Sequence, residues 1–526
     1  MEQRKGIKKI VKSQAGILLI LILASAVRLM KLGSIPNGTY TDEAYGAYLA
    51  YGLLTEGMDD WGYHFPVYFT AWGSGMSALY LYIGAFLFKL FGISLTVYRI
   101  PQALMGICAV YALYIVCGEI FDKRLALLAA LALAVNPWHI MMCRFGLDAN
   151  LAPNMFLVGL MFLVLGVKKK DIFWIPAAVC FGFTLYCYAL TWLFLPTFLV
   201  LCLVLFYRQL PEKKWVFSFA CILFVMAIPL FLFLAVNFDL IPEIKTSFLS
   251  IPKLTGFRGG ELAPENIRAG IGSLFALLVT EQGDGRVLLS CEVTGSYYYF
   301  TTPLFVFGVI SHMVMLVRDR RKGEHDLSFV FFAWLLCAGI VSILNHSITM
   351  IHVNMIHIPV IFYGAYGIWK IDRLLHSRKT GYICTAFYLF SFAFFIKTYN
   401  FFGFPDFFDE KPYEAVETAR EIAGEDGVVT IVGFDATYKY PNLLWQEKWS
   451  ISDYAENKVM DGDPYFANLV EYGTYRYMDE NLGDMVVPDG VYVIKDYQIG
   501  DFRKRGFEII RVNEQYAVAA GSQSVR

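Results

Sequence analysis

Residues 16–46 read GILLILILASAVRLMKLGSIPNGTYTDEAYG. The first half is an apolar run close to the length that crosses a bilayer as a helix, roughly 17–25 residues. The second half becomes polar at once and carries two adjacent carboxylates, Asp42 and Glu43. Five basic residues between Arg4 and Lys12 precede the run, and no convincing small-residue cleavage site follows it. The stretch therefore predicts a retained membrane anchor with a cytoplasmic N-terminus and an acidic pair just outside the membrane.

The composition of the whole chain agrees with this reading. Of its 526 residues, 57% are hydrophobic and 17% are charged, whereas a soluble domain carries about 25% charged residues. The formal net charge of −1 argues against nucleic acid as a partner. Ten cysteines are present, several of them scattered through apolar runs, and none forms a CxxC pair. They predict buried small side chains and no disulfide framework.

We expect a polytopic α-helical membrane protein with about eleven transmembrane helices, because eleven apolar runs have close to the necessary length. The runs lie at about 14–31, 100–119, 125–141, 151–167, 172–189, 190–207, 216–236, 298–317, 328–345, 352–369 and 380–399.

Basic clusters between the runs support this count, because the positive-inside rule places such clusters in the cytoplasm. An even number of runs separates every two neighbouring clusters, so all can share one side. The clusters are Lys123–Arg124, Lys168–Lys170, Arg208 with Lys213–Lys214, Arg318–Lys322, and Lys370 with Arg373, Arg378 and Lys379. A further apolar segment, 75–91, would reverse this pattern if it crossed. We therefore expect it to lie on or dip into the outer leaflet.

Two long loops, 32–99 and 237–297, then face outward. After about residue 400 the sequence becomes polar, and runs such as Val428–Val432 and Val491–Ile494 are typical of strands. The expected organisation is a membrane catalytic domain over 1–399 and a small α/β domain over 400–526 on the outer side. The protein would be a multi-pass protein of the plasma membrane.

The first outer loop holds the clearest chemical signal. Thr41 can cap a helix whose first turn carries Asp42 and Glu43. The pair fits a capped surface helix, and it equally fits a general base that removes a proton from an attacking hydroxyl. Tyr45 follows closely. The segment 59–72 supplies His64 together with Trp61, Tyr63, Tyr68 and Trp72, which could line a sugar or acceptor site.

Two further groups of polar residues lie where runs emerge on the outer side. Arg144 and Asp148 are four residues apart, so on a helix they would share a face, as a local ion pair or as a phosphate-binding cation and a second acid. The turn around His352, Asn354 and His357 is the other group. These side chains could hydrogen-bond a phosphate or ligate a metal, although their spacing is not a strong zinc pattern.

The order of these features resembles the GT-C membrane glycosyltransferases, nearest to the protein O-mannosyltransferase-like and lipid A aminoarabinose-transferase-like group. The resemblance rests on the acidic first loop, the Tyr98–Pro101 entry to the next run and the Cys143–Asn150 segment, in that sequence. It covers roughly residues 1–210 well and 298–370 more weakly. Relatives often have Ser at position 143, and an Asn-x-Asn-Arg form where this chain has His352, Asn354 and Met355.

The resemblance implies an inverting transfer of a monosaccharide from a polyprenyl-phosphate donor to an acceptor hydroxyl at the outer membrane face. It makes Asp42 the catalytic base, with Glu43 near the acceptor. We assign donor-phosphate binding to Arg144, His352 and His357. We assign substrate binding to Asp148, Tyr45, His64 and Asn354. No cofactor is expected, although a divalent metal is possible. The sugar and the acceptor, whether glycan, lipid or protein, stay open.

A transporter or lipid flippase is the alternative. Such proteins place charges near the bilayer midplane and often contain internal repeats with broken helices. Here the candidate residues gather at one membrane face and no repeat is visible, which favours an enzyme.

Overall fold

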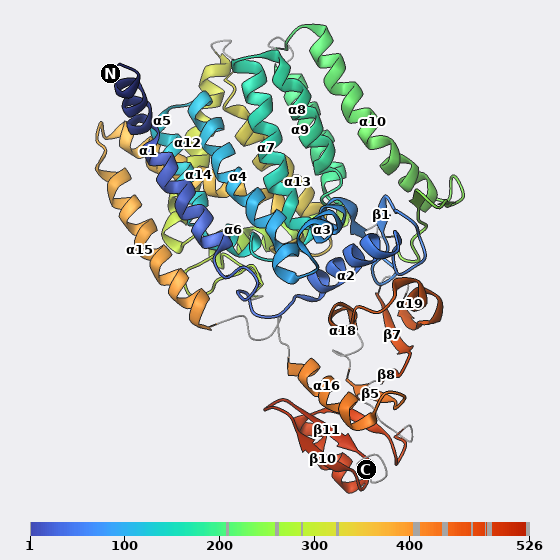
Figure 1. Ribbon diagram of the computed structural model, residues 1–526. Coiled ribbons are helices and arrows are strands. Elements are labelled where there is room, and N and C mark those ends of the chain that lie inside the picture. Colours follow the sequence, from blue (N-terminus) through green and yellow to red (C-terminus); the bar gives the residue numbers. More distant parts are fainter. Residues whose placement is uncertain are drawn as a thin grey trace. The chain divides into compact units, whose positions relative to one another are not determined.

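The computed structural model describes residues 2–206, 210–257, 262–285, 288–321, 326–402, 411–433, 440–463, 466–478, 480 and 486–521 (Figure 1). Arg208 and Lys322, two members of the basic clusters, lie outside these residues. The chain forms two compact units. The helical unit contains residues 1–35, 95–231 and 259–403, and the mixed unit contains residues 36–94, 232–258 and 404–526.

The helical unit consists of long helices joined by short turns. Its longer helices are α1 (Glu2–Leu29), α4 (Leu95–Ile120), α5 (Lys123–Ala134), α7 (Asp148–Lys168), α8 (Trp174–Thr184), α9 (Thr191–Phe206), the first part of α10 (Lys213–Asn237), α12 (Thr302–Arg321), α13 (Phe329–Leu344), α14 (Asn354–Leu374) and α15 (Lys379–Phe402). Shorter elements are α6 (Pro137–Met142), α11 (Ile267–Phe275), η1 (Asp171–Phe173), η3 (Pro264–Asn266), η4 (Ala276–Thr280) and η5 (Tyr299–Thr301).

Each of the eleven predicted runs coincides with helix. Among the described residues, five helices are long and apolar enough to cross a membrane: α4, α7, α10, α12 with the turn before it, and α15. The chain is thus a membrane protein of predominantly helical structure, while the number of eleven crossings stays a prediction. The run at 125–141 is divided, because Asn136 caps a new helix that starts at Pro137. A proline disrupts a continuing helix but suits a first turn.

Close helix packing in this unit depends on glycine. A Cβ atom at Gly308 of α12 would lie 2.2 Å from the carbonyl oxygen of Tyr363, and one at Gly367 of α14 would lie 2.1 Å from that of Leu304. Small residues let helices approach closely where a bilayer supplies no hydrophobic driving force between them. The α12–α14 contact therefore requires glycine at both positions.

The mixed unit joins parts that are distant in sequence. It contains α2 (Thr41–Thr55), α3 (Ala78–Phe91), β1 (Tyr68–Phe69), β2 (Met76–Ser77), β3 (Ile244–Lys245) and β4 (Ser250–Ile251), together with the C-terminal domain. The compact units therefore do not follow the expected division at residue 399. Contacts join the first loop to residues beyond 440, such as the hydrogen bond from Ala467 N to Trp72 O of 2.7 Å.

The C-terminal domain is built on one mixed sheet of seven strands in the order β10-β11-β9-β5-β8-β7-β6. The strands are β5 (Val429–Val432), β6 (Val459–Asp463), β7 (Phe466–Tyr472), β8 (Tyr475–Met478), β9 (Val491–Lys495), β10 (Glu508–Arg511) and β11 (Tyr516–Ala520). The central strand β5 runs parallel to both neighbours, β8 and β9. Its other elements are α16 (Lys411–Ala423), α18 (Tyr440–Glu447), α19 (Ile451–Asn457), η6 (Asp496–Gln498) and α20 (Ile499–Lys504).

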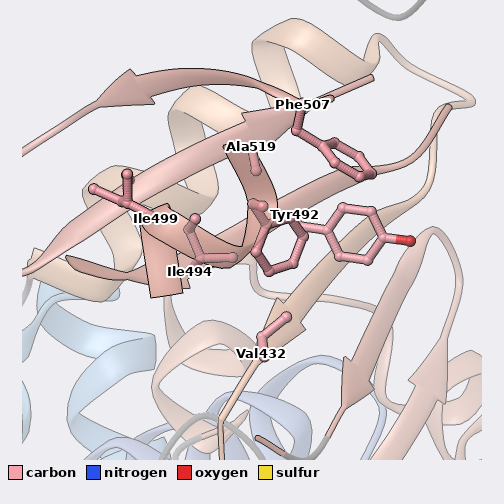
Figure 2. Packing of buried hydrophobic residues seen from close by; sticks show 8 residues of the cluster. Val432, Tyr492, Ile494, Ile499, Phe507 and Ala519 are labelled. Carbon is pink, nitrogen blue, oxygen red and sulfur yellow. The ribbon is translucent and has the colours of Figure 1, made fainter. Parts of the chain in front are cut away.

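Apolar side chains from strands and helices form the core of this domain, as Figure 2 shows. Tyr492 and Ile494 of β9 are buried beside Ala519 of β11, and Phe507 meets the Tyr492 ring edge-on at 5.5 Å. The strand-like runs at Val428–Val432 and Val491–Ile494 are therefore confirmed as β5 and β9, so the predicted C-terminal sheet exists.

The segment predicted to lie along the membrane forms α3, which has 14 residues. A straight helix of this length is about 21 Å long, whereas the hydrocarbon core of a bilayer is about 30 Å thick. Its length is therefore compatible with a surface position, and the orientation of α3 stays a prediction.

Candidate functional site

The residues singled out from the sequence fall on both units. Asp42, Glu43, Tyr45 and His64 belong to the mixed unit. Arg144, Asp148, His352, Asn354 and His357 belong to the helical unit. The geometry below is that of each half by itself, and the joining of the halves into one active site stays a prediction.

The acidic pair stands on the first turn of α2. We expected Thr41 to be the N-cap residue. Instead Tyr40 is the N-cap residue and Thr41 is the first residue of the helix. Asp42 is partly exposed, whereas Glu43 is 0% exposed. A helix N-terminus stabilises negative charge, because unpaired backbone N–H groups point outward there. Asp42 can thus meet a substrate, and Glu43 lies in the protein behind it.

Tyr45 connects this helix to a second acidic pair that sequence reasoning did not single out. The Tyr45 hydroxyl donates to Asp60 Oδ2 at 2.7 Å, and Tyr45 itself is 0% exposed. Lys458 of the C-terminal domain lies 3.5 Å from the same carboxylate oxygen, with its side chain only 6% exposed. Its ammonium group also stands 4.2 Å from the centre of the Trp61 ring. Tyr45 therefore makes an internal contact, and its predicted substrate contact is untested.

Asp59 shapes the turn that carries this second pair. Its Oδ1 accepts hydrogen bonds from the backbone N–H groups of Trp61 and Tyr63 at 3.0 and 2.9 Å. Burial, with the neighbouring Asp60 charge, raises the pKa of Asp59 to about 7. Burial also raises the pKa of Asp60 and lowers the pKa of Lys458. The two buried carboxyl groups of the turn thus lie beside the buried amine of Lys458. Desolvation favours the neutral form of each of these three groups.

The aromatic residues of segment 59–72 mainly pack within the mixed unit. The Tyr63 hydroxyl donates to Glu243 at 2.7 Å. The Tyr68 ring lies 4.7 Å from that of Phe233. His64 pairs with Met58 in an isolated bridge and is partly exposed. Of this segment, His64 is thus a residue that could still contact a substrate.

Arg144 closes the C-terminal end of α1. Its Nε donates to the carbonyl oxygen of Ile35 at 3.1 Å, and its Nη2 donates to that of Met30 at 2.8 Å. Nη1 donates to the carbonyl oxygen of Val27. The guanidinium also lies 5.9 Å from the centre of the Tyr399 ring on α15. Carbonyl groups at a helix end have no partners within the helix, so Arg144 supplies donors that α1 needs.

The structure brings together two groups that are far apart in sequence, the start of α7 and the start of α14. Asn354 Nδ2 donates to the carbonyl oxygen of Ala149, directly after Asp148. Gln102 of α4, not singled out from the sequence, donates to Asn150 O at 2.8 Å. The side-chain oxygens of Gln102, Asn150 and Asn354 are buried with no hydrogen-bond partner among the described residues. These acceptors can bind water or donor groups of a ligand.

The two histidines of the predicted turn differ in their surroundings. His352 is partly exposed, and its Nδ1 donates to Ser347 O at 2.8 Å. His357 is fully buried. Its Nε2 donates to Met350 O at 2.9 Å, and its Nδ1 accepts from the Tyr297 hydroxyl. Because His357 is buried and His352 is partly exposed, His352 is better placed to meet a ligand.

An apolar cavity of about 360 Å³ lies farther along the helical unit. Side chains from α7, α9 and α10 line it, among them Val164, Leu199, Cys202, Phe206, Phe219 and Leu223. Val164 stands 16 residues along α7 from Asp148, which corresponds to about 24 Å. The polar start of α7 and the apolar cavity thus occupy different levels of one helix.

The sequence left open whether the site binds a divalent metal ion. Among the described residues, no three His, Cys, Asp or Glu side chains gather into a ligand set.

Sequence reasoning missed this cluster because Asp60 and its partner Lys458 are almost 400 residues apart. The adjacent carboxylates of Asp59 and Asp60 in an aromatic segment were the signal present in the sequence. Gln102 carried a weaker signal, an amide inside an apolar run.

Residues 77–233 match the profile of the family described as dolichyl-phosphate-mannose-protein mannosyltransferase. No curated protein matches the sequence.

Three solved structures are similar over most of the chain. The crystal structure of ArnT from Cupriavidus metallidurans in the apo state has 13% identity and a TM-score of 0.57, covering 98% of this chain and 99% of that chain. The structure of the same protein bound to undecaprenyl phosphate has 13% identity and a TM-score of 0.58, with the same coverage of both chains. The Archaeoglobus fulgidus oligosaccharyltransferase tethered with an acceptor peptide containing the NVT sequon has 13% identity and a TM-score of 0.54, covering 98% of this chain and 75% of that chain.

These findings confirm the resemblance predicted from the sequence. The fold of this chain is the one shared by ArnT and the Archaeoglobus fulgidus oligosaccharyltransferase, which are GT-C membrane glycosyltransferases, and residues 77–233 resemble the mannosyltransferase family model.

Proposed function

We propose that this GT-C-fold chain transfers a monosaccharide from a polyprenyl-phosphate donor to an acceptor hydroxyl at the outer face of the plasma membrane, with inversion at the anomeric carbon. The N-terminus would be cytoplasmic and the C-terminal domain would face outward. ArnT, similar to this chain in fold, is known bound to undecaprenyl phosphate, which supports a lipid-linked donor.

The observation that carries this proposal is the state of the acidic pair. Asp42 stands partly exposed on the first turn of α2, with Glu43 buried beside it in sequence. A helix N-terminus favours negative charge, and a carboxylate within reach of substrate can accept a proton. This combination of position and exposure suits a general base better than it suits a purely structural cap.

The helical unit supports a lipid-phosphate donor in two ways. The start of α7 gathers Asp148, the partly exposed His352 turn and buried amide oxygens, which suit a polar head group. The cavity about 24 Å farther along α7 has apolar walls, which suit an isoprenoid tail. A donor whose head group lies near Asp148 and whose tail reaches towards Val164 would occupy both the polar start of α7 and the apolar cavity.

In the reaction, Asp42 takes the proton of the acceptor hydroxyl while that oxygen attacks the anomeric carbon. The bond from this carbon to the phosphate oxygen breaks in the same displacement, and polyprenyl phosphate leaves with the electron pair. The sugar passes through an oxocarbenium-like transition state. Positive charge or hydrogen-bond donors near the phosphate stabilise the departing anion. The candidates for that role are Arg144, His352 and His357.

Asp42→Asn tests the base directly. Asn has the shape of Asp but accepts no proton, so transfer should fall by about 10²–10⁴-fold while folding and insertion are retained. Each radiolabelled donor, polyprenyl-phosphate mannose, glucose, galactose or aminoarabinose, is supplied separately to purified full-length protein together with a membrane fraction as the source of acceptor. The measurement is the label that leaves the donor lipid and appears in acceptor material.

The matched control is Asp239→Asn, because Asp239 is an exposed carboxylate whose ion pair with Lys253 lies in another loop of the same unit. Transfer by the control should equal that of the unchanged protein. If Asp42→Asn keeps more than half of the activity, Asp42 is not the base. If lipid-linked sugar crosses the membrane without transfer, the chain is a flippase instead.

A further inference from the structure

We propose that the C-terminal domain is a working part of the transfer site, in which Lys458 and Asn442 act as positioning residues that hold the first turn of α2 and its carboxylates in one orientation. This inference rests on the proposed role of Asp42. It concerns contacts made within the mixed unit alone.

Asn442 of α18 holds the chain just before α2. Its Nδ2 donates to both the carbonyl oxygen and the hydroxyl oxygen of Thr39, each at 2.9 Å. Both residues are buried. Thr39 lies three residues before Asp42, so this contact fixes the direction in which the chain enters the helix.

Lys458 holds the same turn from the other side through Asp60. The Asp60 carboxylate accepts from the Tyr45 hydroxyl at 2.7 Å and lies 3.5 Å from Lys458 Nζ. Lys458 also donates to the backbone carbonyl of Asp60. Tyr45 lies three residues after Asp42. The two contacts from the C-terminal domain therefore bracket Asp42 and Glu43 along the chain.

The far end of α2 is anchored to the same domain. Glu56 accepts from the backbone N–H groups of Ile451 and Ser452 at 2.9 and 3.1 Å, at the start of α19. The Tyr48 hydroxyl donates to Trp449 O at 3.2 Å. Together these contacts fix α2 at both ends, so a rotation of α2 that would turn Asp42 away from a substrate must break several buried hydrogen bonds.

The nature of the contacts separates positioning from simple adhesion. Apolar packing alone would hold two parts together at less cost than a buried amine beside two buried carboxyl groups, because charges lose their hydration on burial. Directional contacts fix an orientation, and here they end within three residues of Asp42. A catalytic base must be held this closely, since a misplacement of about 1 Å can lower a rate by about 10²-fold.

A double-mutant cycle tests the Lys458 contact. Lys458→Met leaves the buried Asp60 carboxylate without its cationic partner. The double variant Lys458→Met with Asp60→Asn removes both charges and keeps an acceptor for the Tyr45 hydroxyl. In full-length protein in lipid nanodiscs, the single variant should lower kcat by about 10-fold or more, with KM for the polyprenyl-phosphate donor within about twofold. The double variant should recover most of kcat. The rate of amide hydrogen exchange of residues 37–50 should rise in the single variant. In the double variant it should return to the rate of the unchanged protein.

Asn442→Ala is the second, milder variant and decides the question if Lys458→Met does not fold. It should lower kcat and raise exchange at residues 37–50. Its matched control is Asn457→Ala, because Asn457 is an exposed amide on the neighbouring helix. Lys504→Met is the control for the lysine, since Lys504 is exposed and pairs with Asp501 three residues before it. Both controls should behave as the unchanged protein.

The outcomes are separable. The inference fails if Lys458→Met and Asn442→Ala both fold and keep kcat within about twofold, or if the double variant is no better than Lys458→Met alone. If the unchanged protein transfers sugar from no donor, the proposed function fails, and the exchange measurements still decide whether Lys458 and Asn442 hold α2.

Discussion

Arg144 illustrates how contacts in space can give a side chain a role that its position in the sequence did not suggest. Its guanidinium donates to carbonyl groups of Val27, Met30 and Ile35 at the end of α1. A guanidinium offers five donors in a fixed plane, which suits phosphate oxygens and suits converging carbonyls equally well. The observed contacts favour the second use, and phosphate binding by Arg144 stays a prediction.

Substitutions at Arg144 separate these uses. Arg144→Ala leaves several carbonyl groups without donors, so it should destabilise the protein by about 1–3 kcal/mol or more. Arg144→Lys places a single ammonium group there and should recover only part of the stability. The measurement is the thermal unfolding midpoint in detergent, taken together with donor binding by the folded protein.

If Arg144 binds donor phosphate, Arg144→Lys should weaken donor binding strongly while the unfolding midpoint hardly changes. A fall in the midpoint with donor affinity retained would assign the residue to the closure of α1.

Asp59 predicts a pH dependence of stability. Its folded-state pKa is raised to about 7 by burial beside Asp60, whereas an unfolded Asp titrates near 3.9. The folded state therefore binds the proton more tightly, so the stabilisation is complete below about pH 4 and is lost as the pH rises to about 7. The effect is on the order of 2–4 kcal/mol, because one pKa unit corresponds to about 1.4 kcal/mol.

Asp59→Asn isolates this contribution. Asn keeps an oxygen acceptor for the N–H groups of Trp61 and Tyr63 but has no charge to lose. The variant should be more stable than the unchanged protein at pH 8, and the two should converge towards pH 4–5. Equal pH profiles in thermal unfolding would show that Asp59 is not the titrating group.

Among the elements, α3 decides how the later helices are oriented. At 14 residues it is shorter than a straight crossing requires. If it does not cross, Lys89 and Lys169 lie on opposite sides of the membrane. Cys introduced at Lys89 should react with an impermeant thiol reagent from outside, and Cys introduced at Lys169 should react only after permeabilisation. Both lysines are exposed.

Native cysteines are the control for this labelling, because Cys108 and Cys221 are exposed in the structure. Labelled peptides must therefore be identified by mass spectrometry. Reaction at residue 89 from the cytoplasmic side alone would overturn the arrangement of eleven crossings.

At the level of the whole molecule, the candidate residues are shared between two compact units. A metal ion that bridges Asp42, Asp148 and a histidine is one way to join them, and direct binding of the donor phosphate by His352 and Arg144 is the other. The guanidinium of Arg144 has a permanent charge and a fork of donors that suits phosphate oxygens without a metal, and the spacing of the histidines is not a strong zinc pattern. We therefore expect transfer to survive extensive EDTA treatment. Loss of transfer on chelation, restored by one particular divalent ion, would make Asp148 a ligand.

The sequence by itself determined the membrane class, the positions of the helices and the acidic first loop. These features are local: an apolar run must bury its backbone as a helix in lipid, and its length and flanking charges are visible in the chain. The strands β5 and β9 were predictable for the same reason, because β-branched and aromatic residues gather in short runs. The break before Pro137 is also a local event, although hydropathy alone concealed it.

Only the tertiary structure decided which polar residues meet. Lys458 and Asp60 are nearly 400 residues apart, and neither position shows its partner in the chain. The carbonyl partners of Arg144 at the end of α1 are likewise visible only in the structure. The same limit applies to the domain division, because the first loop joins the C-terminal domain through buried contacts such as that of Asn442 with Thr39. A hydrogen bond depends on distance and direction in space, and sequence spacing fixes these only within one element.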